Sequence, residues 1–169
     1  MSPMRKKPKL KRLEIIEAVV MDFDGVHTDD LVYINENGME SVCCSRSDGM
    51  GLAALREFGF RLLIISKETN PVVSMRGKKL SIEVIQNCDN KIDELKAWML
   101  RNSIESSRCL YIGNDINDIE CLQYVGVAVA PADAHPSVWK SIDWQLKNNG
   151  GRGALRELSD ELIRVKGKK

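Results

Sequence analysis

The chain has 169 residues and a formal net charge of +1, with 25 lysines and arginines against 24 acids, a length that suits one domain. Six basic residues and no acid lie within residues 1–12, and three lysines lie within 166–169, so residues 13–165 carry a net charge of −8. Such an acidic body excludes the basic face that a nucleic-acid-binding surface needs. We therefore expect one domain at 13–165 between two mobile basic tails.

Hydropathy and cysteine usage bear on location. No apolar stretch approaches the roughly 18 residues that a membrane-spanning helix needs. The five cysteines are odd in number and lack the spacing of a zinc site, so we expect neither bound zinc nor a disulfide framework. Free thiols are typical of a reducing compartment, and the expected location is the cytoplasm.

The first half of the chain alternates short apolar runs with helical segments. The Asn-Gly pair within one polar stretch is the typical turn of a hairpin, and Asp48 suits the cap of a helix. In chain order we predict a strand at 18–24, a hairpin at 31–44 with its turn at 35–38, a helix at 48–58 and a strand at 61–66.

The second half continues the alternation. A helix begins at Asn70-Pro71, a good cap and first-turn pair, and the helix at 92–100 is expected to turn Ile92, Leu95 and Leu100 toward the core. The predicted elements are a helix to Leu80, a strand at 82–85, a helix at 92–100, a strand at 109–113, a short helix at 116–124, a strand at 127–130, a small helix at 136–140, a strand at 142–146 and a helix at 153–165.

Strands that alternate with helices predict a doubly wound α/β fold, because each crossover between parallel strands is right-handed and roughly helix-length. The hairpin is then an insert after the first strand. Ligands of such sheets bind beyond the carboxyl ends of the strands. Asp22, Asp24, Ser66 and Asn114 all follow predicted strands, so we expect the functional site at that edge.

Asp22 and Asp24 are the strongest chemical signal. Two carboxylates that leave a buried strand two residues apart repel each other unless a cation lies between them. A hard divalent ion such as Mg²⁺ prefers oxygen ligands of this kind. The alternative is a polar turn that happens to contain two acids.

A second polar cluster, Gly-Asn-Asp-Ile-Asn-Asp, spans residues 113–118. By itself it also suits the cap of the next helix. Lys91 lies near a helix start, where the helix dipole disfavours a cation; it is either a solvated lysine or the partner of Asp118, directed at a bound anion. Ser66 is either a strand-end cap or a ligand contact.

These residues occur in the order Asp-x-Asp-Gly-Val-x-Thr, a strand-end Ser, a Lys, and Gly-Asn-Asp-x-x-Asp, which resembles the haloacid dehalogenase (HAD) superfamily over about residues 15–165. The hairpin, residues 47–51 and 132–135, and the GGRGALRE string at 150–157 resemble one branch that lacks a cap domain. That branch contains 3-deoxy-manno-octulosonate (KDO) 8-phosphate phosphatase, phosphatases of nine-carbon sugar-acid 9-phosphates, and the C-terminal module of some CMP-sialic acid synthetases.

The resemblance implies a Mg²⁺-dependent phosphatase that acts on KDO 8-phosphate or on a nine-carbon 2-keto-3-deoxy acid 9-phosphate. It implies that Asp22 is the nucleophile and forms an aspartyl-phosphate, and that Asp24 is the general acid and base. Ser66 and Lys91 would hold the phosphoryl oxygens, with Asp118 orienting Lys91. The implied Mg²⁺ ligands are Asp22, the main-chain carbonyl of Asp24, and Asn114.

The resemblance also implies partners. The candidate substrate-binding residues are Arg46, Asp48, Glu68, Arg76, Lys79 and Arg152; for each basic member a solvated charge is an equally good interpretation. The branch resembles homotetramers whose subunits cover one another's sites, which makes the hairpin an interface element. No nucleic acid or membrane partner is expected.

Three residues depart from the pattern of the branch. Asn114 stands where the octulosonate phosphatases generally have an Asp metal ligand, although the synthetase module tends to carry Asn there. Lys67 replaces the Gly that usually follows the strand-end Ser, and His27 replaces a usually apolar residue and is expected to be a packing or rim residue. The first two keep a second hypothesis open: a catalytically weakened oligomerisation or regulatory module. A phospho-accepting receiver domain is disfavoured by the Asp-x-Asp spacing and the hairpin.

Overall fold

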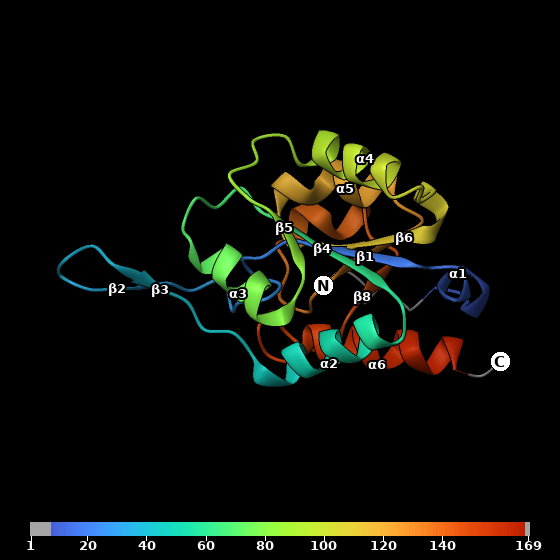
Figure 1. The fold of residues 1–169 in the computed structure, drawn as a ribbon, viewed down its shortest axis with the longest axis horizontal. Coiled ribbons are helices and arrows are strands. Elements are labelled where there is room, and N and C mark those ends of the chain that lie inside the picture. Colours follow the sequence, from blue (N-terminus) through green and yellow to red (C-terminus); the bar gives the residue numbers. More distant parts are fainter. Residues whose placement is uncertain (1–7, 168–169) are drawn as a thin grey trace.

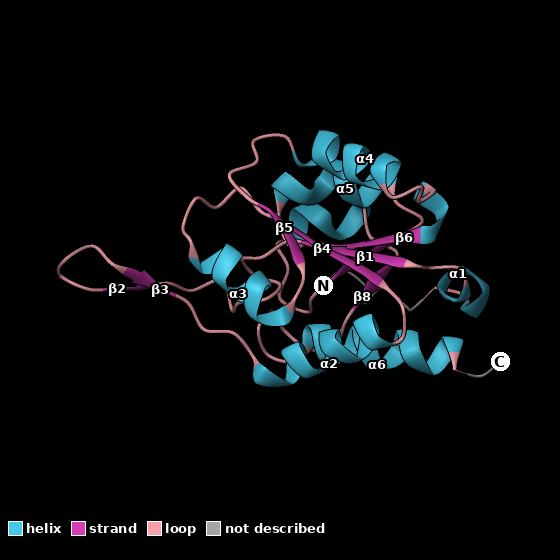
Figure 2. Cartoon of the chain, in the orientation of Figure 1, coloured by secondary structure: helices cyan, strands magenta, loops and turns pink. Residues whose placement is uncertain are grey.

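The computed structural model describes residues 8–167 as a parallel sheet with helices on both faces (Figures 1 and 2). The sheet has the strand order β5-β4-β1-β6-β7-β8, and every neighbouring pair is parallel. Its strands are β1 (Ala18–Met21), β4 (Arg61–Ile65), β5 (Glu83–Ile85), β6 (Cys109–Ile112), β7 (Val127–Ala130) and β8 (Trp144–Gln145). This confirms the predicted doubly wound α/β fold.

The helices form two layers, one on each face of the sheet (Figure 1). One layer holds α4 (Lys91–Arg101) and α5 (Ile119–Tyr124); the other holds α2 (Arg46–Glu57), α3 (Val72–Leu80) and α6 (Ala154–Lys166), with α1 (Leu10–Glu14) packed against α6. Short 3₁₀ turns complete the chain: η1 (Ser106–Arg108), η2 (Ile116–Asp118) and η3 (Pro136–Lys140).

Alternation along β1 builds the two hydrophobic cores, because successive side chains of a strand point to opposite faces. Val19 and Met21 pack into the cluster that contains the apolar side chains of α2 and α6. Ala18 and Val20 pack into the other cluster, with those of α4 and α5. All four side chains are fully buried, which explains why this strand is a continuous apolar run.

The register of β1 brings the chemically interesting loops to one edge. Met21, the last residue of β1, pairs with Ile64 of β4 and with Ile112 of β6. The chain therefore leaves these three neighbouring strands at nearly the same level. Asp22 and Ser66 lie immediately past this level, with Asn114 close behind.

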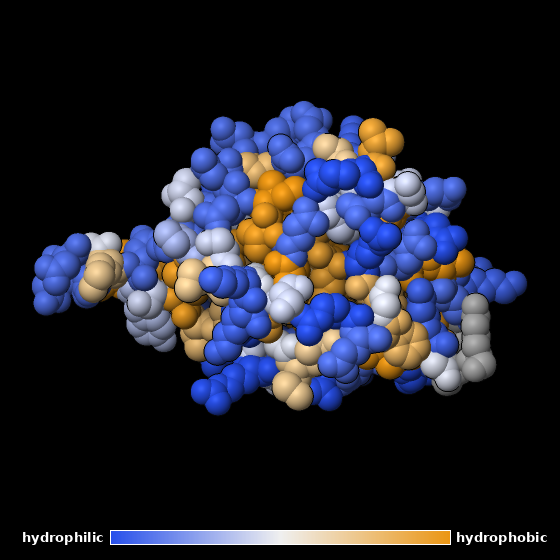
Figure 3. Space-filling model, in the orientation of Figure 1, coloured by the Kyte–Doolittle hydropathy of each residue, from blue (hydrophilic) through white to orange (hydrophobic). Residues whose placement is uncertain are grey.

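The hairpin is a projection rather than part of the sheet. Within the described part of the chain, its strands β2 (Tyr33–Ile34) and β3 (Glu40–Ser41) pair with each other alone, and they extend at the left of Figure 1. The Asn35 side chain closes the turn by accepting hydrogen bonds from the backbone N–H groups of Asn37 and Met39, both at 3.0 Å. Figure 3 shows hydrophobic side chains exposed among polar ones on this projection.

Several predicted details are wrong. The strand at 18–24 ends at Met21, because the Phe23 carbonyl accepts hydrogen bonds from residues 26–28 and turns the chain. The strand at 142–146 is only two residues long. Leu100 was expected in the core but is 84% exposed, and Trp98 and Met99 fill that place beside Leu95.

The boundaries of the expected tails also need correction. Arg12 belongs to α1, and its guanidinium pairs with Asp143 at 2.9 Å. Lys166 ends α6. The other tail residues at 1–7 and 168–169 lie outside the described part of the chain. Between residues 8 and 167, no helix combines the length and apolarity needed to cross a membrane, and all five cysteines are free thiols.

Candidate active site

Asp22 and Lys91 form the buried centre of the site. The Lys91 ammonium lies 2.8 Å from Asp22 Oδ1 and 2.9 Å from Asp118 Oδ1, so one cation bridges two carboxylates. All three side chains are at most 7% exposed. The Phe23 N–H also donates to Asp22 Oδ1, at 2.7 Å. One oxygen of Asp22 is thereby held by two donors.

Burial and charge act against each other in this centre. Burial raises the pKa of Asp22 well above its ordinary value, Asp118 raises it further, and Lys91 lowers it. Burial by itself would lower the pKa of Lys91, but the charges of Asp22 and Asp118 raise it overall. Lys91 therefore stays a cation. The two carboxylates outweigh the unfavourable effect of the helix dipole on a positive charge at the start of α4.

Asp118 is held rigidly by four donors. Tyr111 Oη donates to its Oδ1 at 2.7 Å, beside Lys91. The backbone N–H groups of Asn114 and Asp115 donate to its Oδ2 at 2.9 and 3.3 Å. This confirms the predicted pairing of Lys91 with Asp118. Tyr111 was missed by the sequence analysis, although a tyrosine within a fully buried strand needs a partner for its hydroxyl group.

Three oxygen atoms gather on the other side of Asp22. The Asn114 side-chain oxygen lies 3.2 Å from Asp22 Oδ2 and 2.9 Å from the main-chain carbonyl oxygen of Asp24. If the amide were flipped, its nitrogen would take this position and donate hydrogen bonds to both oxygens. Oxygens that share an octahedral Mg²⁺ ion lie about 3 Å apart, because each is about 2.1 Å from the ion. The donor set and its spacing fit Mg²⁺, with Asn114 turned oxygen inward.

Gly25 permits this arrangement. Its φ is +73°, and a Cβ atom at this position would lie 1.9 Å from Asn114 Nδ2. Only glycine combines this backbone conformation with the close approach of the amide. Among residues 8–167 no cluster of three or more His, Cys, Asp or Glu side chains could bind a metal; a Mg²⁺ ion at the oxygen cluster described above would instead be held by one carboxylate, one amide and one main-chain carbonyl.

Asp24 stands at the mouth of the site and is half-buried. Burial raises its pKa to about 6, with further contributions from the charges of Glu68 and Asp30, while Lys91 opposes them. A carboxyl group with this pKa exists in both protonation states near neutral pH, which suits a residue that gives and takes a proton.

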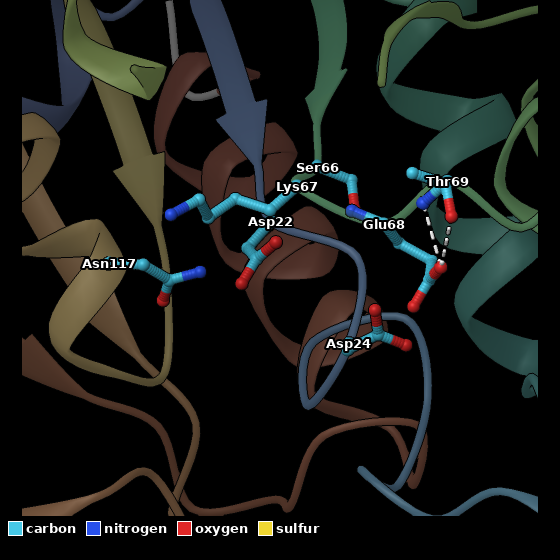
Figure 4. A pocket seen from close by; sticks show the side chains of 7 residues that line it. All are labelled: Asp22, Asp24, Ser66, Lys67, Glu68, Thr69 and Asn117. Atoms are coloured by element: carbon cyan, nitrogen blue, oxygen red, sulfur yellow. Dashed lines mark hydrogen bonds between the residues drawn. The ribbon is translucent and has the colours of Figure 1, made fainter. Parts of the chain in front are cut away.

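A cavity of about 260 Å³ opens over these carboxylates. Figure 4 shows Asp22 at its centre, with Asp24, Glu68 and Thr69 on one side and Asn117 on the other. Ser66 lines the cavity, and its Oγ accepts a hydrogen bond from the Glu68 N–H at 3.1 Å. Of the predicted substrate-binding residues only Glu68 lines this cavity; Lys67, Thr69 and Asn117 were not assigned to the site from the sequence.

Asp48 has a structural role in place of the helix cap expected for it, and it does not line the cavity over Asp22, so its expected contact with a substrate stays a prediction. It does not cap α2, because the Oγ of Ser45 accepts the hydrogen bond from the Asp48 N–H at 3.3 Å. Its own carboxylate is buried and accepts hydrogen bonds from the N–H groups of Arg156 at 2.8 Å and Gly153 at 3.3 Å. Asp48 therefore satisfies the first N–H groups of α6.

The four basic substrate-binding candidates lie elsewhere. Arg76 donates to the Ser45 carbonyl at 2.9 Å, and Arg152 pairs with Asp29 at 2.8 Å. Arg46 and Lys79 are exposed. None of the four lines the cavity over Asp22. Within this chain, their expected contact with a substrate in that cavity stays a prediction without support.

Of the two roles expected for His27, packing or the rim of the site, the structure shows packing. His27 is 2% exposed and stacks on Phe23, with ring centroids 5.5 Å apart. Burial and the charge of Arg76 lower its pKa to about 3. The imidazole is therefore neutral at physiological pH.

Comparison with known proteins supports the family resemblance that the sequence motifs indicate. Residues 63–158 match the family model of haloacid dehalogenase-like hydrolases. The chain is 31% identical over 160 residues to the 3-deoxy-D-manno-octulosonate 8-phosphate phosphatase KdsC of Escherichia coli, which covers 94% of this chain and 85% of the relative.

Solved structures agree. A HAD-family chain from Streptomyces avermitilis is 42% identical, with a TM-score of 0.88 over 95% of this chain and 90% of that one. The Moraxella catarrhalis 3-deoxy-D-manno-octulosonate 8-phosphate phosphatase, in complex with magnesium, phosphate and KDO, is 29% identical, with a TM-score of 0.90 over 94% and 92%. The buried aspartate at the sheet edge thus lies in a protein that belongs to the haloacid dehalogenase-like hydrolase family and is a phosphatase of that family.

Proposed function

We propose that this protein hydrolyses the phosphomonoester of a sugar acid, with Mg²⁺, through a phosphorylated Asp22. The observation that carries the proposal is the environment of Asp22: Lys91 and the Phe23 N–H hold one oxygen, and the oxygens of Asn114 and Asp24 lie beside the other. A carboxylate held in this way is oriented for attack at a phosphorus atom above it.

In the first step an Asp22 oxygen forms a bond to phosphorus, and the bond between phosphorus and the sugar oxygen breaks. Asp24 gives its proton to the departing sugar oxygen. Lys91 and Ser66 stabilise the charge of the transferring phosphoryl group. A Mg²⁺ ion held by Asp22, Asn114 and the Asp24 carbonyl would supply further charge neutralisation.

In the second step water attacks the phosphorus of the aspartyl-phosphate. Asp24, now ionised, takes a proton from this water, the bond between Asp22 and phosphorus breaks, and inorganic phosphate leaves. A pKa of about 6 lets Asp24 act first as an acid and then as a base. Asp118 does not take part in bond making; it keeps Lys91 in place.

The substrate class rests on the relatives. KdsC acts on 3-deoxy-D-manno-octulosonate 8-phosphate, and the Moraxella catarrhalis structure contains KDO and phosphate. We assign this chain to KDO 8-phosphate or to a nine-carbon 2-keto-3-deoxy acid 9-phosphate. The polar residues Glu68 and Thr69 beside Asp24 offer hydrogen-bond partners to the hydroxyl groups of such a leaving group.

The test is phosphate release from a panel of sugar-acid phosphates, with and without Mg²⁺. We expect turnover only with Mg²⁺, and Asp22→Asn should lower kcat by roughly a thousandfold or more. Asp160→Asn is the matched control, because Asp160 is exposed on α6 and, among residues 8–167, forms an ion pair with Arg156 alone. Absence of turnover across the whole panel would contradict the proposal.

One observation favours a second candidate, a catalytically weakened regulatory or oligomerisation module. The oxygen cluster contains a neutral amide where an acid would bind Mg²⁺ more tightly. Asn114→Asp separates the two candidates. For a competent phosphatase it should tighten Mg²⁺ binding and change kcat at saturating Mg²⁺ by less than about threefold, whereas a gain of more than about tenfold would indicate an attenuated enzyme.

We also propose a cytoplasmic homotetramer in which the hairpin lies at the subunit interface. The free cysteines support the cytoplasmic location, because free thiols suit a reducing compartment. The assembly is supported by large exposed apolar side chains, which suit a subunit interface. Those of the hairpin region are Leu31, Val32, Tyr33, Ile34 and Met39, each at least 51% exposed. Sedimentation of the purified protein tests the assembly: we expect a tetramer, and Ile34→Asp should dissociate it. A monomeric wild type would contradict this part.

A further inference from the structure

Among the seven described residues that line the cavity over Asp22, Lys67 is the only one with a cationic side chain. The other charged members of that lining are Asp22, Asp24 and Glu68. Within residues 8–167, Lys67 makes no ion pair and no side-chain hydrogen bond. It is therefore an uncommitted positive charge in a cavity that three carboxyl groups also line.

The other lysine at the site does not offer the same freedom. The charge of Lys91 is shared between Asp22 and Asp118, at 2.8 and 2.9 Å. A phosphomonoester carries close to two negative charges at neutral pH and would enter a cavity lined by acids. Such an anion is stabilised by a cation that is not already neutralised.

The direction of the Lys67 side chain indicates which part of the ligand it meets. In Figure 4 it extends toward Asn117, on the side of Asp22 away from Asp24, Glu68 and Thr69. Lys67 and Asn117 also both line an adjoining cavity of about 360 Å³, together with Lys91. The ammonium group of Lys67 therefore lies on the same side of Asp22 as Lys91.

We propose that Lys67 binds a non-bridging oxygen of the phosphoryl group. The inference rests on the proposed function, in which Asp24 protonates the leaving group. The sugar then departs on the side of Asp24 and Glu68, and Lys67 faces the oxygens that stay on phosphorus. Lys67 thus selects for the doubly charged phosphomonoester and makes no contact with the carboxylate of the sugar acid.

The experiment compares Lys67→Gln, Lys67→Arg and the wild type. Lys140→Gln is the matched control, because Lys140 is exposed in η3 and lines neither cavity. Calorimetry in Mg²⁺ gives the Kd of inorganic phosphate. Kinetics give KM for two esters, a sugar-acid phosphate and a phosphomonoester without a carboxylate. Loss of one charged hydrogen bond predicts an increase of about tenfold in the phosphate Kd and in both KM values.

Lys67→Arg should stay within about threefold of the wild type, since it keeps the charge, and Lys140→Gln should match the wild type. A KM increase confined to the carboxylate-bearing ester would overturn the assignment and place Lys67 on the sugar acid. Unchanged constants in Lys67→Gln would make it a solvated lysine. A wild type that neither binds phosphate nor hydrolyses esters would overturn the proposed function itself, and this inference with it.

Discussion

Replacing Lys91 by Met is the sharpest test of how the active centre is held together. Methionine keeps much of the length of the side chain but removes the charge that bridges Asp22 and Asp118. Because both carboxylates contact one nitrogen atom, their nearest oxygens are at most about 6 Å apart, where two like charges repel by about 3 kcal/mol at an effective dielectric constant of about 20. Loss of the two charged hydrogen bonds adds to this repulsion.

We expect Lys91→Met to lower the free energy of unfolding by about 3–5 kcal/mol at pH 8, as for other broken buried ion pairs. This is a large part of the 5–15 kcal/mol typical of a domain. Lys91 lowers the pKa of Asp22, so its removal raises that pKa further above the unfolded value. Such a raised pKa stabilises the fold at low pH and loses this contribution as pH rises. The destabilisation should therefore be smaller at pH 5 than at pH 8.

Urea unfolding at both pH values, followed by far-UV circular dichroism, measures these effects. A double-mutant cycle with Asp118→Asn isolates the pairing, because the double variant no longer buries two unpaired carboxylates. We expect it to be less destabilised than the sum of the single variants by about 2 kcal/mol. A loss below about 1 kcal/mol in Lys91→Met, additive single effects, or a loss that grows toward low pH would each refute the reasoning.

Three more predictions follow from individual contacts. Asp48→Ala should lower the free energy of unfolding by about 1–2 kcal/mol, because the first N–H groups of α6 lose their acceptor. KM should stay unchanged, and a change in KM at unchanged stability would instead support a substrate contact by Asp48. Glu68→Gln should lower the pKa of Asp24 and move the alkaline limb of the pH–rate profile to lower pH, because Glu68 raises that pKa; an unmoved or raised limb would argue against Asp24 as the acid. Gly25→Ala should weaken Mg²⁺ binding, measured by calorimetry, because the added Cβ displaces the Asn114 amide. An unaltered Mg²⁺ affinity would show that this amide is not a ligand of the ion.

Local sequence patterns were sufficient for the architecture of the sheet. Short runs rich in apolar residues located all six strands. The four inner strands are almost wholly buried and have hardly any polar positions, whereas the edge strands β5 and β8 each include a polar residue. These runs did not locate the ends well, because a strand stops where its partners stop. Residues 142–146 read as five strand residues, but only Trp144 and Gln145 pair with β7 as a strand; the flanking N–H groups of Asp143 and Leu146 each donate a single hydrogen bond to a β7 carbonyl.

In the helix at 91–101, the sequence likewise does not decide which apolar residues face the core. The apolar residues of this helix outnumber the places on the core side, and periodicity alone assigned Leu100 to the core. The structure buries Trp98 there, with its indole N–H donating to Glu83 at 2.8 Å. A choice between two apolar residues depends on the shape of the neighbouring strand and on a distant acceptor.

The catalytic centre divides in the same way. Asp22, Asp24, Ser66 and Asn114 follow strand ends, and parallel strands bring their carboxyl ends to one edge of the sheet. Local sequence was therefore enough to predict this cluster, and the predicted pairing of Lys91 with Asp118 is present in the structure. The roles of Asp48 and Tyr111 were decided only by tertiary structure. Asp48 meets a helix start 108 residues away, and a buried polar side chain takes whichever partner the folded chain brings within reach. Motif order predicts the groups that react, while long-range packing decides which groups hold them in place.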